Sequence, residues 1–194
     1  MKSTSALHSL IIAFLLLPAP GLAQKGSVEL GADLSASYNL IDDIDGFETD
    51  DIFQFTLPFG GSTAPLISPQ TGFRVGFFVS DVVAIEPVTT FAFLDSGGDN
   101  ITTWSLAAKL LYHFSSDASR PRFYLGGGGT LSLFAESDSD TETQFGLLGE
   151  LGVKLPVSDY FGWRLAAGFT RLFESDSFNG QSIIFAAVGF SVFP

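Results

Sequence analysis

The chain has 194 residues, a formal net charge of −12 at pH 7, a mean hydropathy of +0.35 and no cysteine. The lack of cysteine excludes a disulfide framework and thiolate chemistry, and the negative charge argues against nucleic acid or anionic lipid as an electrostatic partner. Charged residues make up only 15% of the chain, below the roughly 25% typical of soluble domains.

The N-terminal segment has the features of a secretory signal peptide. Lys2 supplies a positive charge, residues 10–17 (LIIAFLLL) form a short apolar core, and a Gly-Leu-Ala tripeptide ending at Ala23 resembles a cleavage site. The apolar run is too short to span a bilayer, and no later run reaches the about 18 residues that a transmembrane helix needs. We therefore expect residues 1–23 to be a signal peptide and residues 24–194 to form one exported domain.

Eight segments of alternating apolar and polar residues follow in chain order. In the first, SVELGADLSASYNL, every second residue from Val28 to Leu40 is apolar. A strand directs successive side chains to opposite faces, so each segment predicts a β-strand with one apolar and one polar face. The segments are residues 27–40, 72–79, 82–93, 102–114, 122–134, 144–155, 161–170 and 182–192.

A ninth alternating segment, residues 51–60 (DIFQFTLPFG), complicates the count. Nine strands would place the two termini on opposite sides of a membrane, whereas bacterial single-chain barrels have even strand numbers. Proline inside such a segment suits a break or an edge, and Pro58 is followed by the stretch GGSTAPLISPQT. We interpret this segment as the loop-side part of the second strand.

The connections between these strands alternate between compact turns and acidic loops. The turns at residues 79–82, 115–121 and 156–159 contain no acidic run. An up-and-down barrel with short turns on one rim and longer polar loops on the other has this layout. Fourteen of the 21 acidic residues lie in the other four connections, at residues 42–51, 95–100, 136–143 and 174–180.

The polar face indicates which side looks inward. It consists mostly of Gly, Ser, Thr and Ala with isolated charges of both signs, which suits an eight-stranded barrel whose interior is just wide enough for side chains. The apolar face carries aromatic rings near both strand ends, as a lipid-facing barrel requires. The predicted fold is an all-β, eight-stranded antiparallel up-and-down transmembrane β-barrel. The rings are Phe93, Trp104, Phe145 and Phe169 toward the loops, and Tyr112, Phe114, Phe123, Phe161 and Trp163 toward the turns.

Eight charged residues fall on the predicted inward face in equal numbers of each sign. Buried charges must be paired, and mixed signs predict a plugged interior, since a transport filter more often shows rings of one sign. A turn at Ser80-Asp81 would place Arg74 nearly opposite Glu86. The alternative is that some of these charges lie at the rims in water without partners. The set is Glu29, Asp33, Glu86 and Glu150 with Arg74, Lys109, Lys154 and Arg164.

The signal peptide, the eight alternating segments, the RVGFFVSD turn and the alternating C-terminal segment resemble the small bacterial outer-membrane β-barrel proteins of the OmpA/OmpX-like group. In that group the final residue is usually aromatic, whereas Phe193 is penultimate here and Pro194 is last. The resemblance implies a protein of the Gram-negative cell outer membrane without a cofactor. Its expected partners are outer-membrane lipid, lipopolysaccharide and the barrel assembly machinery, and we expect a monomer.

Two motifs fail as ligand sites. The GGGG run at residues 126–129 is not followed by the Lys-Ser/Thr of a phosphate loop. In the acidic stretch 42–51, a loop glycine at Gly46 would put Ile41 and Ile52 at the first and last EF-hand ligand positions. We therefore expect no cofactor site and no metal site.

The sequence leaves several functions open. His113-Phe-Ser115 is similar to the His-x-Ser pair of lipid A deacylase barrels, but only Asp117 lies near in sequence, and a nucleophile needs a base and an orienting acid. We expect no catalytic residue and a role in envelope structure or surface interaction through acidic extracellular loops. The alternatives are a small-solute channel, a lipid A-modifying barrel enzyme and a soluble lipocalin-like binder.

Overall fold

The computed structural model describes residues 25–41, 52–57, 61–62, 72–96, 99–136, 141–175 and 179–194. The predicted signal peptide lies outside these residues. The described part of the chain contains no helix that is long and apolar enough to cross a membrane.

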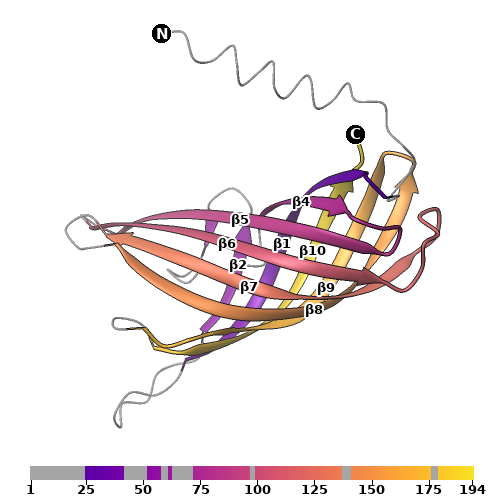
Figure 1. Cartoon of the computed structure of the whole chain (residues 1–194). Helices are drawn as coiled ribbons and strands as arrows, with labels where there is room; N and C mark the ends of the chain where they lie inside the picture. Colours follow the sequence, from indigo (N-terminus) through magenta and orange to yellow (C-terminus); the bar gives the residue numbers. More distant parts are fainter. Residues whose placement is uncertain are drawn as a thin grey trace.

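Ten β-strands form one antiparallel sheet that closes on itself through pairing of the first strand with the last (Figure 1). The predicted eight-stranded barrel is confirmed once β2 and β4 are recognised as parts of one strand, as the next paragraph shows. The strands are β1 (Val28–Ile41), β2 (Ile52–Leu57), β3 (Gly61–Ser62), β4 (Phe73–Phe78), β5 (Val83–Ser96), β6 (Asp99–His113), β7 (Arg122–Glu136), β8 (Glu142–Ser158), β9 (Phe161–Leu172) and β10 (Gln181–Val192).

β2 and β4 together occupy a single position in the barrel wall. β2 pairs with residues 35–39 of β1, and β4 pairs with residues 28–32 of the same strand. β10 covers the other edge of β1 over residues 30–41, so β2 and β4 share one edge. The interpretation of residues 51–60 as the loop-side part of the second strand is therefore confirmed for residues 52–57.

Two predicted connections are shorter than expected. The β5–β6 ladder continues to the pair Ser96 and Asp99, so most of the predicted loop 95–100 lies within the hairpin. β8 extends through Pro156 to Ser158 with a bulge between these residues. Backbone pairing accounts for both differences, because it does not require the side chains to alternate. We call the barrel end with the turns after β4, β6 and β8 the turn end, and the opposite end the loop end.

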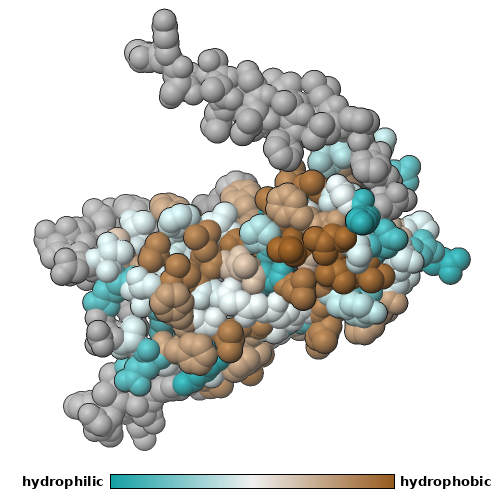
Figure 2. Space-filling model, in the orientation of Figure 1, coloured by the Kyte–Doolittle hydropathy of each residue, from teal (hydrophilic) through white to brown (hydrophobic). Residues whose placement is uncertain are grey.

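The apolar face looks outward, as predicted. Leu151 is 63% exposed on the outside, whereas Leu111 is fully buried inside. Figure 2 shows apolar side chains gathered over the barrel wall, with hydrophilic residues nearer the two ends. Among the predicted rings, the side chain of Phe93 lies outside the described ones and Phe161 is half-buried. The remaining rings are exposed, namely Trp104, Phe145, Phe169, Tyr112, Phe114, Phe123 and Trp163.

The lumen changes character along its length. At the turn end it holds an apolar cluster to which Phe193 belongs, and the Phe193 N–H donates to the Tyr160 carbonyl at 3.0 Å. Phe193 therefore points inward. Toward the loop end the lumen is lined by buried hydroxyl and amide groups, including Thr103, Ser105, Thr130, Ser132, Gln144 and Thr170. The apolar cluster consists of Phe78, Ala84, Leu111, Tyr124 and Phe193.

Candidate functional site

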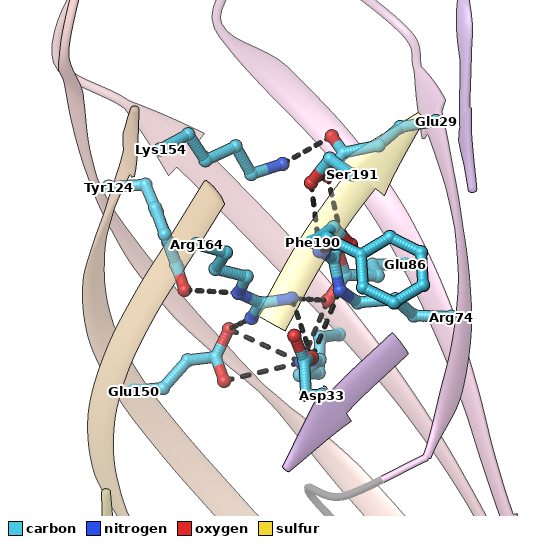
Figure 3. Close-up of polar contacts among 11 residues, drawn as sticks. Glu29, Asp33, Arg74, Glu86, Tyr124, Glu150, Lys154, Arg164, Phe190 and Ser191 are labelled. Atoms are coloured by element: carbon cyan, nitrogen blue, oxygen red, sulfur yellow. Dashed lines mark hydrogen bonds and ion pairs between the residues drawn. The ribbon is translucent and has the colours of Figure 1, made fainter. Parts of the chain in front are cut away.

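The eight charged residues predicted to face the lumen lie together between these two regions (Figure 3). None is more than 6% exposed, because each occupies an inward position in the alternation of its strand. They come from six strands, so the contacts cross the barrel as well as following its wall. β1 supplies Glu29 and Asp33, β4 Arg74, β5 Glu86, β6 Lys109, β8 Glu150 and Lys154, and β9 Arg164.

Arg74 is the cation with the most acidic neighbours on the β1 side. Its Nη1 lies 2.5 Å from Glu29 Oε1, and its Nε lies 3.0 Å from Asp33 Oδ2. Glu86 is more distant, with Oε2 at 3.5 Å from Nη1. The β4–β5 ladder pairs Arg74 with Val88, two residues from Glu86. The expectation that Arg74 lies nearly opposite Glu86 is therefore wrong in register, and its nearest acids are on β1.

Arg164 is the corresponding cation on the β9 side. Its Nη1 contacts Glu86 Oε1 at 2.8 Å and Asp33 Oδ2 at 3.4 Å, and its Nη2 pairs with Glu150. Lys109 Nζ lies 2.8 Å from Glu86 and 3.2 Å from Glu150. Every acid in this half of the network thus has at least two cationic neighbours.

Lys154 extends the network toward the turn end. Its Nζ lies 2.5 Å from Glu29 Oε2, so Glu29 joins Lys154 to Arg74. The residues Glu29 and Lys154 are 125 positions apart in the sequence. We call the eight charged residues the luminal network from here on.

A glycine gives the luminal network the space it needs. Gly189 of β10 lies between Asp33 and Arg164 in the strand pairing. A Cβ atom there would come within 1.8 Å of Asp33 Oδ1, which is too close for any side chain. The small residue therefore allows the carboxylate of Asp33 to stand between the two arginines.

Neutral polar residues complete the hydrogen bonding, and the sequence interpretation did not identify them. Ser191 accepts a hydrogen bond from Arg74 Nη2 at 2.8 Å and donates to Glu29 at 2.6 Å. Arg164 Nε donates to the Tyr124 hydroxyl at 2.6 Å. Both residues share the inward alternation of the charged positions, so strand periodicity could have indicated them. It could also have indicated Arg122, which is buried and was not included among the inward charges.

The His113-Phe-Ser115 motif does not assemble into a catalytic pair in the described part of the chain. His113 is buried in the lumen, where its ring contacts Phe78 and Tyr124 with centroids 5.3 and 5.7 Å apart, and its Nδ1 lies 3.3 Å from the Val82 carbonyl. The Ser115 hydroxyl instead accepts a hydrogen bond from the backbone N–H of the turn at 3.1 Å.

The turn after β6 carries its own polar cluster outside the barrel wall. Ser119 donates from its hydroxyl and its backbone N–H to Asp117 Oδ1, at 2.6 and 3.0 Å. These hydrogen bonds, with Arg120 nearby, hold the pKa of the Asp117 carboxyl below its usual value. The acid therefore stays ionised and serves Arg120 in the turn.

A closed antiparallel barrel with an apolar exterior and a charged, filled interior defines a membrane β-barrel protein. The sequence matches the family model described as outer membrane protein beta-barrel domain over residues 9–192. The chain belongs to this family, and it is a small β-barrel protein of the outer membrane.

Solved structures of bacterial barrels share the fold. Neisserial surface protein A (NspA) superposes with a TM-score of 0.59 at 14% identity, covering 85% of this chain and 96% of that chain. The Ail protein of Yersinia pestis gives 0.46 at 11% identity over 87% and 99% of the two chains. The N-terminal barrel of Pseudomonas aeruginosa OprF gives 0.44 at 16% identity over 86% and 99%. A comparison with curated protein sequences finds no significant match.

Proposed function

We propose that this barrel is a non-enzymatic, non-conducting protein that contributes to envelope structure or surface interaction through the acidic connections at its loop end. The luminal network is the observation that supports this proposal. The interior of an eight-stranded barrel leaves little room beyond its side chains, and here ion pairs join residues of opposite walls, as between Glu29 and Lys154 or Glu86 and Arg164. A solute would have to separate buried charges to pass.

The distribution of acidic residues supports the surface role. Fourteen of the 21 acids lie in the four connections of the loop end, and the described strand ends Ile41, Glu136 and Leu172 lie at that end. Carboxylates at this density suit cation-bridged contact with lipopolysaccharide phosphates or with a basic partner. NspA, which shares the fold, is named a surface protein. The proposed protein is a monomer in lipid, delivered by the barrel assembly machinery.

Planar-bilayer recording tests the closed lumen. The purified protein should show no steady open channel, while a porin inserted in the same bilayer conducts and serves as the positive control. A stable, large conductance from the wild type would contradict the proposal and favour the small-solute channel.

Envelope phenotypes test the surface role. A deletion strain should become more sensitive to detergents and chelators, and a variant with the acids of residues 42–51 changed to their amides should restore resistance poorly. Full restoration by this variant would show that the barrel acts without these acids.

A further inference from the structure

Three cations stand side by side at the turn end of the lumen. Arg164 of β9 pairs with Lys154 of β8, and Lys154 pairs with Arg122 of β7. Directly opposite residues on neighbouring strands have Cβ atoms about 4.5–5.5 Å apart, and like charges at this separation are destabilising. Arg164 and Lys154 are compensated by acids that reach them across the lumen, Glu150 and Glu29 among them. The third cation has no such partner in the described part of the chain.

Arg122 is a buried cation that lacks an acceptor. Its side chain is 3% exposed, and its buried Nη1 has no hydrogen-bond partner among the described residues. The guanidinium lies 5.4 Å from the ring centroid of Phe78. The ring face attracts the charge but offers no oxygen acceptor, and a buried charged donor without one is costly. The position is therefore suited to an acceptor that the chain itself does not supply.

A pocket lies against this cation. It encloses ≈ 290 Å³, partly open to solvent, and its lining includes Arg122 and Lys154 from the lumen and Arg120 from the turn after β6. Arg120 is exposed and pairs with Asp117 at 3.2 Å. The other side of the pocket includes Pro156, where the β8 strand bulges, and Trp163. The pocket thus joins three cations to the barrel wall at the turn end.

We propose that this pocket binds a phosphate group between Arg122 and Lys154. A guanidinium presents paired N–H donors that match two phosphate oxygens, and the negative charge would offset the repulsion within the cation row. Trp163 lines the pocket and is 48% exposed on the lipid-facing side, among the rings that mark the membrane interface. The phosphate can therefore come from a phospholipid headgroup or from free phosphate. This site is independent of whether the lumen conducts.

Binding to the purified full barrel in a phosphate-free maltoside detergent tests the proposal. The probes are dioctanoyl-phosphatidylglycerol, dioctanoylglycerol without the phosphate, and inorganic phosphate at constant ionic strength, followed by native mass spectrometry and by thermal shift. The wild type should retain one phosphatidylglycerol and no dioctanoylglycerol. Arg122→Gln should weaken binding by roughly tenfold or more. The matched control is Arg171→Gln, a cation of β9 toward the loop end that contacts Ser182, and it should bind as the wild type does.

The two phosphate probes identify the source. Binding of phosphatidylglycerol without competition by inorganic phosphate supports a headgroup site, and equal competition supports a free-anion site. Arg122→Lys, which keeps the charge but loses the paired donors, should bind with intermediate affinity and provides the comparison if Arg122→Gln does not fold. Failure of the wild type to bind either phosphate probe, or wild-type affinity in the folded Arg122 variants, would overturn the proposal.

Discussion

At the scale of the single residue, burial makes losing one charge more costly than losing a matched pair. Arg74 has no exposed side-chain surface, and its acids Glu29 and Asp33 are equally enclosed. Removing a single member of a buried ion pair leaves the other charge without compensation, whereas removing both takes away the penalty together with the attraction. The stability of this barrel should therefore depend on the balance of charge within the luminal network.

Replacing Arg74 tests this balance. Arg74→Ala should lower the free energy of unfolding by about 3–5 kcal/mol, measured by urea unfolding in detergent or by loss of the heat-resistant form on gels. The double variant Arg74→Ala/Glu29→Ala should recover part of the loss because the two side chains are in contact. Pairing Arg74→Ala with Glu86→Ala should recover less, since these groups are 3.5 Å apart. Strictly additive effects for Arg74 and Glu29 would contradict the network.

At the scale of the element, β7 illustrates how a run of glycines serves strand packing. The GGGG run does not form a ligand loop, because residues 126–129 pair continuously with β6 and β8. The inward and outward glycines have different surroundings. A Cβ on Gly128 would lie 1.9 Å from the Ala108 carbonyl oxygen, whereas a Cβ on Gly129 would have its nearest neighbour at 3.7 Å.

These two positions form a matched pair of variants. Gly128→Ala should destabilise the barrel by about 1–3 kcal/mol, because β6 and β7 must separate to admit the methyl group. Gly129→Ala should change stability by no more than about 0.5 kcal/mol, since it adds a methyl group to an outward surface. Urea unfolding of both variants in the same detergent provides the comparison. Equal losses would mean that the close approach of β6 and β7 does not set the cost.

At the scale of the whole molecule, the apolar exterior should show the depth dependence of a bilayer. Leu151→Arg, near the middle of β8, should cost about 2–4 kcal/mol in lipid, whereas Phe114→Arg at the turn end should cost about 0–1 kcal/mol from the charge itself. Both side chains are more than 60% exposed, so the comparison separates depth from burial. Folding titrations in lipid vesicles measure both values. Similar losses at the two positions would place the membrane elsewhere on the barrel.

The orientation of the barrel in the membrane gives a second test at this scale. Cysteine at Glu174, an exposed residue after β9 at the loop end, should react with an impermeant thiol reagent on intact cells. Cysteine at Ser158, an exposed residue at the turn end, should react only after the outer membrane is opened. Labelling of the Ser158 variant alone on intact cells would reverse the proposed orientation.

The sequence by itself determined the sidedness of each strand. Alternation along a strand is a local property of the extended backbone, so it placed Leu151 outward and Glu29 inward without any knowledge of neighbouring strands. It also led to the correct strand number, because Pro58 marked the break between the two parts of the second strand.

Only the tertiary structure decided which inward residues meet. The register between strands and the closure of β1 on β10 bring Glu29 beside Lys154, and neither is encoded by local periodicity. The same stagger moves Arg74 opposite Val88 and aligns Arg122, Lys154 and Arg164 in one row. Contacts across a barrel depend on the shear accumulated around its whole circumference, and this is why the sequence shows the charges while the closed barrel selects their partners.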